Sequence, residues 1–235
     1  MSSFFTQPLF GIALTLFAFQ LGVFLKKKFK LVIFNPVLVS VVFIIGFLSI
    51  LKIDFEAYNV GGKYLSFLLG PTVVALGVLF YEKYQEIKSN FMPFLVAVIT
   101  GGLLSIVSVC IIVFFMGVPD VILRSLAPKS VTAPIAIEIS NILNGMPSVT
   151  AGVVIAVGVF GNAFGPSILK ILGISSKTAL GTALGTASHG IGTARALEEG
   201  KLPGAYSGLA MCINGLITAL VTPFVVEWLL LFLVK

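Results

Sequence analysis

Charged residues are scarce in this sequence of 235 residues. They make up 10% of the chain, whereas 58% is hydrophobic, and soluble proteins carry about a quarter charged residues. Only nine side chains are acidic, so the net charge of +6 depends on just fifteen lysines and arginines. These basic residues do not form the clustered soluble surface that binds DNA, and we therefore expect no nucleic-acid partner. The balance predicts an integral membrane protein.

Cysteine and histidine are also rare. Cys110 and Cys212 lie in separate apolar runs and form neither a CxxC pair nor a disulfide framework. His189 is the single histidine, so the chain lacks the ligands of a transition-metal site. Asp54 and Asp120 lie in predicted loops, which excludes an aspartyl protease dyad, and no dinucleotide-binding or G-x-S-x-G motif is present. We expect no catalytic residues, no metal and no cofactor, and hence not an enzyme.

Long apolar runs, by contrast, are abundant. A helix needs about 20 residues to cross a hydrocarbon core of roughly 30 Å. Six runs are long enough and none shows the two-residue alternation of a barrel strand: Pro8–Leu25, Leu31–Leu51, Tyr64–Tyr81, Asn90–Met116, Pro147–Leu169 and Leu202–Val234. These runs predict an all-α fold.

Two further segments are predicted to be broken or re-entrant. Ala127–Asn144 is interrupted by Lys129, Pro134 and Glu138, and Ile174–Arg195 contains four glycines, each of which costs up to about 1 kcal/mol of helix stability relative to alanine. Together with the six long runs, they give about seven to eight membrane segments.

The two halves of the chain resemble each other weakly. Leu69-Gly70-Pro71-Thr72 matches Leu184-Gly185-Thr186, and Thr100-Gly101 matches Asn214-Gly215, with offsets of 114 to 115 residues. If the first broken segment returns to the side it came from, the copies run in opposite directions, as in the inverted repeats of secondary transporters. We therefore predict one domain, 1–235, with repeat halves 8–117 and 118–235. Chance similarity between apolar helices that contain glycine is the alternative.

Basic residues predict the orientation of the chain, because cytoplasmic loops carry more lysine and arginine. With the amino terminus outside and the carboxyl terminus cytoplasmic, nine basic residues lie on the cytoplasmic side and six on the outer side. We accordingly expect a multi-pass protein of the bacterial plasma (inner) membrane.

The first broken segment contains a cluster of polar residues. Ionisable groups are costly at membrane depth and usually serve a function there. Pro134 suits the first turn of a helix, so Lys129, Ser130 and Thr132 would precede that turn as unwound backbone beside a lysine, which favours an anion site. Glu138 follows in an apolar context. The alternative is an ordinary loop with a snorkelling Lys129 and Thr132 as a helix cap.

The second broken segment holds His189, Arg195 and several hydroxyls. On a continuous helix, spacings of three and four would place Thr186, His189 and Thr193 on one face, where they would line a water-filled passage. Arg195 would bind a carboxylate through two hydrogen bonds. The alternative is that the glycines and hydroxyls, including the GxxxG pairs Gly161–Gly165 and Gly181–Gly185, only allow close helix packing.

Three stretches of the sequence are distinctive: Pro128-Lys129-Ser130-Val131-Thr132-Ala133-Pro134-Ile135-Ala136, Gly161-Asn162-Ala163-Phe164-Gly165 and Gly185-Thr186-Ala187-Ser188-His189-Gly190-Ile191-Gly192-Thr193-Ala194. They resemble signatures of the LrgB/CidB family of antiholin-like membrane proteins. The resemblance covers essentially the whole chain. It implies a bacterial membrane protein with a smaller holin-like partner of the LrgA/CidA type. Plant relatives in this family are plastid glycolate/glycerate translocators, and bacterial members are implicated in pyruvate uptake and in control of murein hydrolase activity and lysis.

The motifs and the resemblance lead to one main prediction and two alternatives. The main prediction is an alternating-access transporter of small monocarboxylates such as pyruvate, glycolate or glycerate, working as a homo-oligomer and coupled to H⁺ or Na⁺. Glu138 or His189 would take the coupled proton, because the unperturbed pKa of histidine is about 6.5. The alternatives are an antiholin-like regulator of a holin-like partner and an intramembrane hydrolase. The predicted substrate-binding residues are Lys129, Ser130, Thr132, Asn162, Thr186, Ser188, His189, Thr193 and Arg195.

Overall fold

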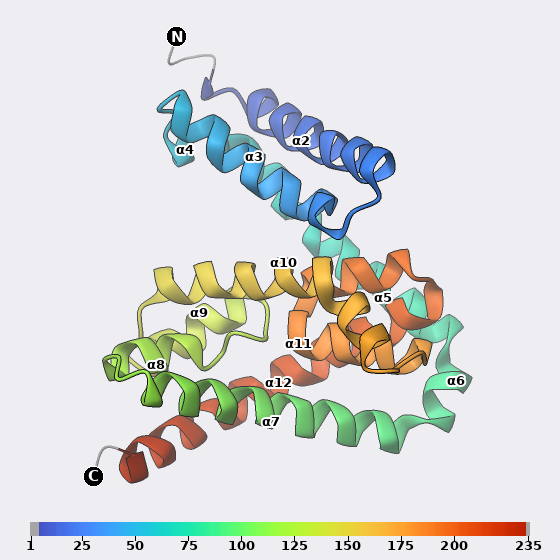
Figure 1. The fold of residues 1–235 in the computed structure, drawn as a ribbon, viewed down its shortest axis with the longest axis vertical. Helices are drawn as coiled ribbons and strands as arrows, with labels where there is room; N and C mark the ends of the chain where they lie inside the picture. The colour runs from blue at the N-terminus through green and yellow to red at the C-terminus, as the bar shows by residue number, and fades with distance from the viewer. Residues whose placement is uncertain (1–4, 234–235) are drawn as a thin grey trace. The chain divides into compact units, whose positions relative to one another are not determined.

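The computed structural model describes residues 5–233, except for the side chains of residues 32, 69, 73, 232 and 233. These residues form helices and connecting turns, with no strand among them (Figure 1). The first helices are α2 (Pro8–Phe29), the 3-10 helix η1 (Val32–Phe34), α3 (Pro36–Ile50), α4 (Phe55–Phe67) and α5 (Leu69–Glu82). They are followed by α6 (Tyr84–Ser89), α7 (Phe91–Phe115), α8 (Asp120–Leu126), α9 (Ala133–Ile142), α10 (Pro147–Ile171), α11 (Lys177–Glu198) and α12 (Lys201–Leu233). The all-α prediction is confirmed for this part of the chain.

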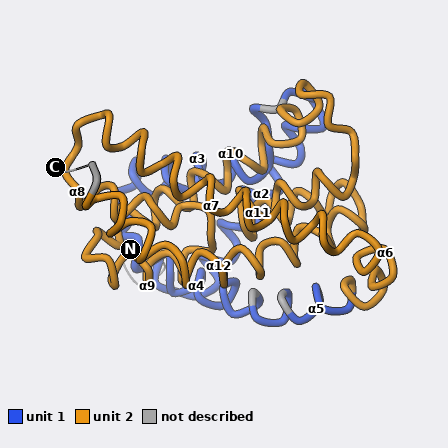
Figure 2. Tube along the Cα trace, turned by 90° about the horizontal axis from the view of Figure 1, so that it is seen from below, with its two compact units in different colours: residues 1–78 blue, residues 79–235 orange. Residues whose placement is uncertain are grey.

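The chain packs as two compact units, Met1–Val78 and Leu79–Lys235, with the boundary inside α5 (Figure 2). In the first unit α2 packs against α3 and α4. A hydrogen bond of 2.8 Å joins the hydroxyls of Thr15 and Tyr58, and Gly11 lies against the backbone of Gly61. Each unit therefore has its own internal contacts, while the predicted domain 1–235 and its repeat halves stay predictions.

Local sequence explains where several helices begin. Pro8, Pro36, Pro134 and Pro147 each stand in the first two positions of a helix, where the missing N–H breaks no intrahelical bond. The side chain of Asn35 caps α3 by accepting hydrogen bonds from the backbone of the next turn, at 2.9 and 3.3 Å. These signals fix the starts of the helices more sharply than hydrophobicity does.

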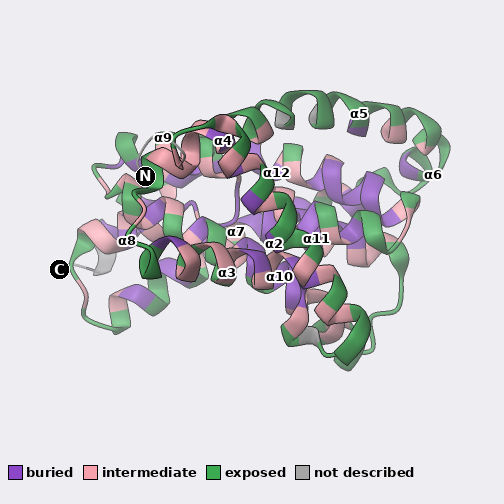
Figure 3. Ribbon diagram, turned by 90° about the horizontal axis from the view of Figure 1, so that it is seen from above, coloured by how far each residue is buried: buried purple, intermediate pink, exposed green. Residues whose placement is uncertain are grey.

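In the second unit α11 packs against α7, α10 and α12 (Figure 1). One apolar cluster joins α7, α8, α9 and the end of α12, and another joins α6, α7 and the start of α12. Buried residues concentrate on α11 and α12 (Figure 3). Arg124 of α8 forms an ion pair with Glu227 of α12 and donates to the carbonyl of Leu143 at 3.1 Å. The broken segments therefore lie within a packed unit.

Five helical stretches are long and apolar enough to cross a membrane, namely Pro8–Phe29, Phe55–Glu82, Phe91–Phe115, Pro147–Ile171 and Lys201–Leu231. The prediction of a spanning helix over Leu31–Leu51 was wrong in length. Asn35 caps the helix and Pro36 is its first residue, so α3 has only 15 residues. The run predicted from Tyr64 begins earlier, since α4 starts at Phe55. The predicted seven to eight segments exceed these five.

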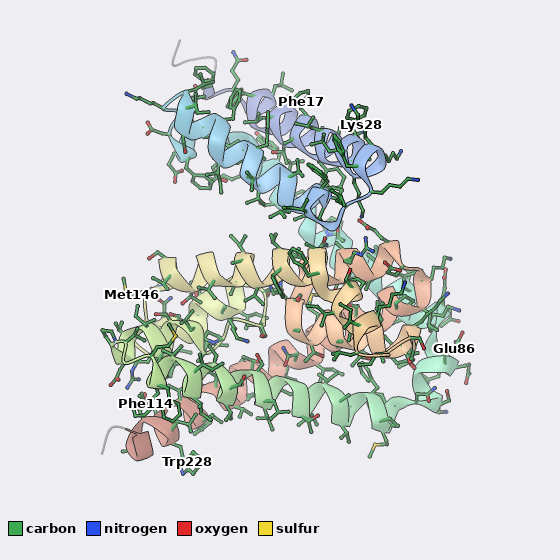
Figure 4. All side chains as sticks on the ribbon, viewed as in Figure 1. Phe17, Lys28, Glu86, Phe114, Met146 and Trp228 are labelled. Atoms are coloured by element: carbon green, nitrogen blue, oxygen red, sulfur yellow. The ribbon has the colours of Figure 1, made fainter. Side chains whose placement is uncertain are left out.

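Large apolar side chains point outward from the long helices, whereas small polar ones are buried. Leu104 and Phe224 are 67% and 77% exposed, and Trp228 projects away from α12 (Figure 4). Asn162, Asn214 and several serine and threonine side chains are almost fully buried. This arrangement suits a lipid environment, in which helix interfaces use small and hydrogen-bonding residues.

Candidate functional site

Helix α11 is interrupted at its centre. Ser188 has φ −132° and ψ 17°, and His189 has φ 42° and ψ −136°, so neither residue is helical. The structure confirms that the glycine-containing segment Ile174–Arg195 is broken. It also corrects the predicted helical face: Thr186 precedes the break and Thr193 follows it, so the two residues do not share one continuous helix.

Side-chain hydrogen bonds hold the backbone around this break and tie it to α10. His189 Nε2 lies 3.0 Å from the carbonyl oxygen of Val154 in α10, and the Asn162 amide donates to the carbonyl of Ile191 at 2.7 Å. The Thr193 hydroxyl donates to the carbonyl of His189 at 2.9 Å and lies 2.9 Å from the Ser207 hydroxyl. The carbonyls of His189 and Ile191 are therefore hydrogen-bonded inside the protein, as an apolar environment requires.

The break fits because glycines face it on α10. A side chain on Gly161 would collide with the Cβ and hydroxyl of Ser188, and one on Gly158 would approach the His189 ring to 2.8 Å. On the opposite side of α11, Gly185 lies against the backbone of Ser207 in α12. These contacts confirm close helix packing at Gly161 and Gly185, which was the alternative role predicted for these glycines.

A second cluster, which we call the Asn214 junction, consists of Ser105, Lys129, Ser130, Thr186 and Asn214. The Asn214 amide of α12 donates to the carbonyls of Ser130 and Thr186, at 3.3 and 3.0 Å. The hydroxyls of Ser105 and Ser130 lie 2.8 Å apart. Both broken segments therefore meet at the Asn214 side chain of α12, and Ser105 of α7 bonds to the first of them.

Lys129 is the cation of the Asn214 junction. Its ammonium group donates to the hydroxyls of Ser105 at 2.6 Å and Ser130 at 3.2 Å. Among the described residues it forms no ion pair with a carboxylate. A lysine bonded only to hydroxyls has no opposite charge beside it, and a bound anion would supply one.

A pocket of about 490 Å³ borders the Asn214 junction. Its walls come from α7, α11 and Tyr206 of α12, and both Ser105 and Thr186 line it. The Thr186 hydroxyl is buried and has no hydrogen-bond partner, whereas buried polar groups in proteins are normally paired. The junction therefore offers a cation and an unused hydroxyl near one cavity.

Other predicted site residues lie elsewhere or are already paired. Arg195 binds Glu198 at 2.7 Å and also Glu199, both in the last turn of its own helix or at its cap. Glu138 is exposed on α9. Thr132 directly precedes α9 and makes no capping bond through its side chain. Their predicted roles in substrate or proton binding stay predictions.

Sequence reasoning missed Ser105, Asn214 and Ser207. Ser105 and Ser207 carry no signal beyond polarity within an apolar helix. Asn214 did carry one, because it belongs to the Asn214-Gly215 pair that matched Thr100-Gly101, and Gly102 leaves the space that the Asn214 amide occupies. Within the described residues, no group of three or more histidine, cysteine or acidic side chains is placed to hold a metal ion.

Comparison with known proteins identifies the family. The model of the LrgB-like family matches residues 15–228. The antiholin-like protein LrgB of Bacillus mycoides (strain KBAB4) is 34% identical over 217 residues, which is 92% of this chain and 94% of that protein. The uncharacterized protein YxaC of Bacillus subtilis (strain 168) is 38% identical over 93% of this chain and 94% of its own length. An uncharacterized protein of Haemophilus influenzae (strain ATCC 51907 / DSM 11121 / KW20 / Rd) is 33% identical over 93% and 95%. No solved structure matches. The chain is a multi-pass membrane protein and belongs to the LrgB-like family.

Proposed function

We propose that this protein is an antiholin-like regulator that associates with a smaller holin-like membrane protein of the LrgA/CidA type and thereby restrains murein hydrolase activity and lysis. The carrying observation is the similarity to proteins named antiholin-like protein LrgB, which extends over 92% of the chain. The exposed apolar faces of α7 and α12 give a membrane partner a surface to pack against. In this proposal the protein is not an enzyme and needs no cofactor.

Co-purification from membranes tests the association. The tagged chain is expressed with a holin-like protein encoded beside it, solubilised in mild detergent and captured. We expect the partner in the eluate with the wild type, and less of it when Leu104 and Phe224 are replaced by alanine. Alanine at Lys28 and Lys30 serves as the control, since the carboxyl-terminal end of α2 is remote from both faces in sequence. Absence of the partner from a folded wild-type eluate would contradict the proposal.

A second function, transport of small monocarboxylates such as pyruvate, glycolate or glycerate, is favoured by the environment of Lys129. Its ammonium group has only hydroxyl partners, and one of them, Ser105, lines a pocket together with Thr186. A carboxylate would supply the missing negative charge and accept hydrogen bonds from the ammonium group and the hydroxyls.

The finer features of this carrier are also proposed. Alternating access would use seven to eight segments in an inverted repeat with an external amino terminus, and the broken centre of α11 would move. Glu138 or His189 would carry a coupled proton, with Na⁺ as the alternative coupling ion. The protein would assemble as a homo-oligomer in the bacterial plasma membrane.

Uptake into proteoliposomes tests transport. Labelled pyruvate, glycolate and glycerate are supplied with and without a proton gradient. We expect Lys129→Gln to lower uptake by at least about tenfold, because a charged partner of a bound carboxylate contributes more than 1.4 kcal/mol. The exposed Lys63→Gln in α4 is the matched control and should keep wild-type uptake. Background uptake by the wild type, or equal uptake by both variants, would contradict transport through this site.

A further inference from the structure

The pocket beside the Asn214 junction is long and follows two helices that start at the same end. On α7 its lining runs from Asn90, at the start of the helix, to Ser105, and on α11 it runs from Thr178 to Ala187. Fifteen residues of helix span about 22 Å. The pocket therefore reaches from one end of α7 to the middle of that spanning helix.

Hydroxyl groups line the α11 wall along this length. Thr178, Thr182 and Thr186 are spaced by four residues, which puts them on one face of the unbroken part of the helix. The Thr182 hydroxyl donates to the carbonyl of Thr178 at 2.8 Å, while Thr186 has no partner for its own hydroxyl although only 6% of the residue is exposed. Threonines therefore continue along this wall to the inner end of a pocket whose lining is otherwise mostly apolar.

A positive charge stands at that inner end. Ser105 lines the pocket and accepts a hydrogen bond from Lys129 at 2.6 Å. Charged groups at membrane depth usually face water or an opposite charge, and no carboxylate pairs with Lys129 among the described residues. A lipid chain filling the pocket would leave the pair formed by Lys129 and Ser105 without hydration.

We propose that this pocket is a water-filled vestibule, open at the end where α7 and α11 begin, which attracts small monovalent anions to Lys129. This inference goes beyond regulation by a partner and does not depend on transport, because a vestibule of this kind binds ions whether or not they cross. Water and a small anion would share its volume.

Cysteine accessibility tests the vestibule. In a background with Cys110→Ala and Cys212→Ala, single variants Thr182→Cys and Ala187→Cys are compared with Leu104→Cys. Leu104 is the neighbour of Ser105, is 67% exposed and does not line the pocket. Vesicles of both orientations are treated with water-soluble methanethiosulfonates. Only thiolates react, and thiolates form in water, so both pocket variants should react at least about tenfold faster than Leu104→Cys.

The charge of the reagent reports on Lys129. The ratio of the rate with the anionic sulfonatoethyl reagent to the rate with the cationic trimethylammonium reagent should be higher at Ala187→Cys than for a small thiol in solution, and Lys129→Gln should lower that ratio about threefold. Lys129→Arg keeps the charge and should keep the ratio. If Lys129→Gln does not elute from gel filtration as wild type does, 0.5 M NaCl replaces it, because salt screens the same attraction.

Two results would overturn the proposal. Equal slow reaction of the pocket variants and Leu104→Cys would mean that lipid or protein fills the pocket. A rate ratio at Ala187→Cys that is insensitive to both Lys129→Gln and salt would mean that no anion is attracted to the lysine.

Discussion

His189 has a backbone conformation that L-amino acids rarely adopt. Its side chain is hydrogen-bonded to the neighbouring helix α10. Its φ of 42° is one of four positive values among the described residues other than glycine, and such conformations cost about 1–3 kcal/mol each. The bond between Nε2 and the Val154 carbonyl, at 3.0 Å, and the contact with Gly158 hold the residue in place. The single histidine is therefore a structural part of the break as well as a candidate for function.

Replacing His189 by glycine or by alanine separates the backbone from the ring. Both variants remove the imidazole, so the difference between them reports the conformation alone. Within a regular helix alanine is more stable than glycine by about 1 kcal/mol, but at this positive φ we expect glycine to be more stable by about 1 kcal/mol. The free energy of unfolding in mixed micelles, measured by SDS titration, checks the sign. Greater stability of the alanine variant would mean that α11 is continuous.

Thr186 and Thr193 differ in how their hydroxyls are bonded. Thr186→Val removes a hydroxyl without a partner, so we expect the free energy of unfolding to stay within about 0.5 kcal/mol of wild type. Thr193→Val breaks bonds to the His189 carbonyl and the Ser207 hydroxyl and should cost about 1–3 kcal/mol. The same titration compares the two isosteric changes. Equal losses would show that Thr186 has a partner after all.

At the scale of helices, the contact between α11 and α12 depends on very close approach. A Cβ on Gly185 would collide with the backbone of Ser207, whereas a Cβ on Gly152, within α10, would meet nothing within 4 Å. We therefore expect Gly185→Ala to destabilise the protein by about 1–3 kcal/mol. The matched Gly152→Ala should stabilise it by up to about 1 kcal/mol through helix propensity. Thermal unfolding in detergent measures both, and a stable Gly185→Ala would refute the packing.

Hydrophobic runs predicted most of the helices because lipid-crossing length and apolar composition go together. The ranges predicted for α7, α10 and α12 differ from the observed ones by a few residues at most. Local signals were underused: Asn35-Pro36 shortens α3, and the start of α4 lies in a less apolar stretch. Glycine content indicated a break within Ile174–Arg195, but its position at Ser188 and His189 depends on contacts with α10 that local propensity does not contain.

The sequence predicted several residues of the candidate site, but it did not predict their hydrogen-bond and ion-pair partners. Scarcity of charge pointed to Lys129, polarity pointed to Thr186, and the family resemblance pointed to Asn162; all three lie at the two clusters described above. Arg195 looked equally suitable, but Glu198 and Glu199 follow it at helical spacing and bind it. The pairing of donors with acceptors across four helices depends on the tertiary structure. A single sequence contains little information about that pairing.

For the whole molecule, the polar groups that distinguish this protein lie inside the second unit, and the long helices present apolar side chains outward. Five candidate crossings are an odd number, which would place the two termini on opposite sides of the membrane; which of them is external stays a prediction. Any further segments would then be re-entrant or cross in pairs.

Reporter fusions test this orientation. A green fluorescent protein at the carboxyl terminus should fluoresce, and an alkaline phosphatase at the same place should be inactive, because the phosphatase folds only outside the cytoplasm, where its disulfides form. Fusions after Lys28 serve as a second point and should give the same result. An active phosphatase at the carboxyl terminus would reverse the orientation.

The proposed antiholin-like function is tested most directly by the onset of lysis. Cells that lack their own proteins of this family express a holin-like partner from an inducible promoter, with or without this chain, at matched membrane levels of the partner. The account predicts that the chain delays lysis and lowers murein hydrolase activity in the medium. Lysis at the same time and with the same hydrolase activity, while the folded chain is present in the membrane, would contradict it.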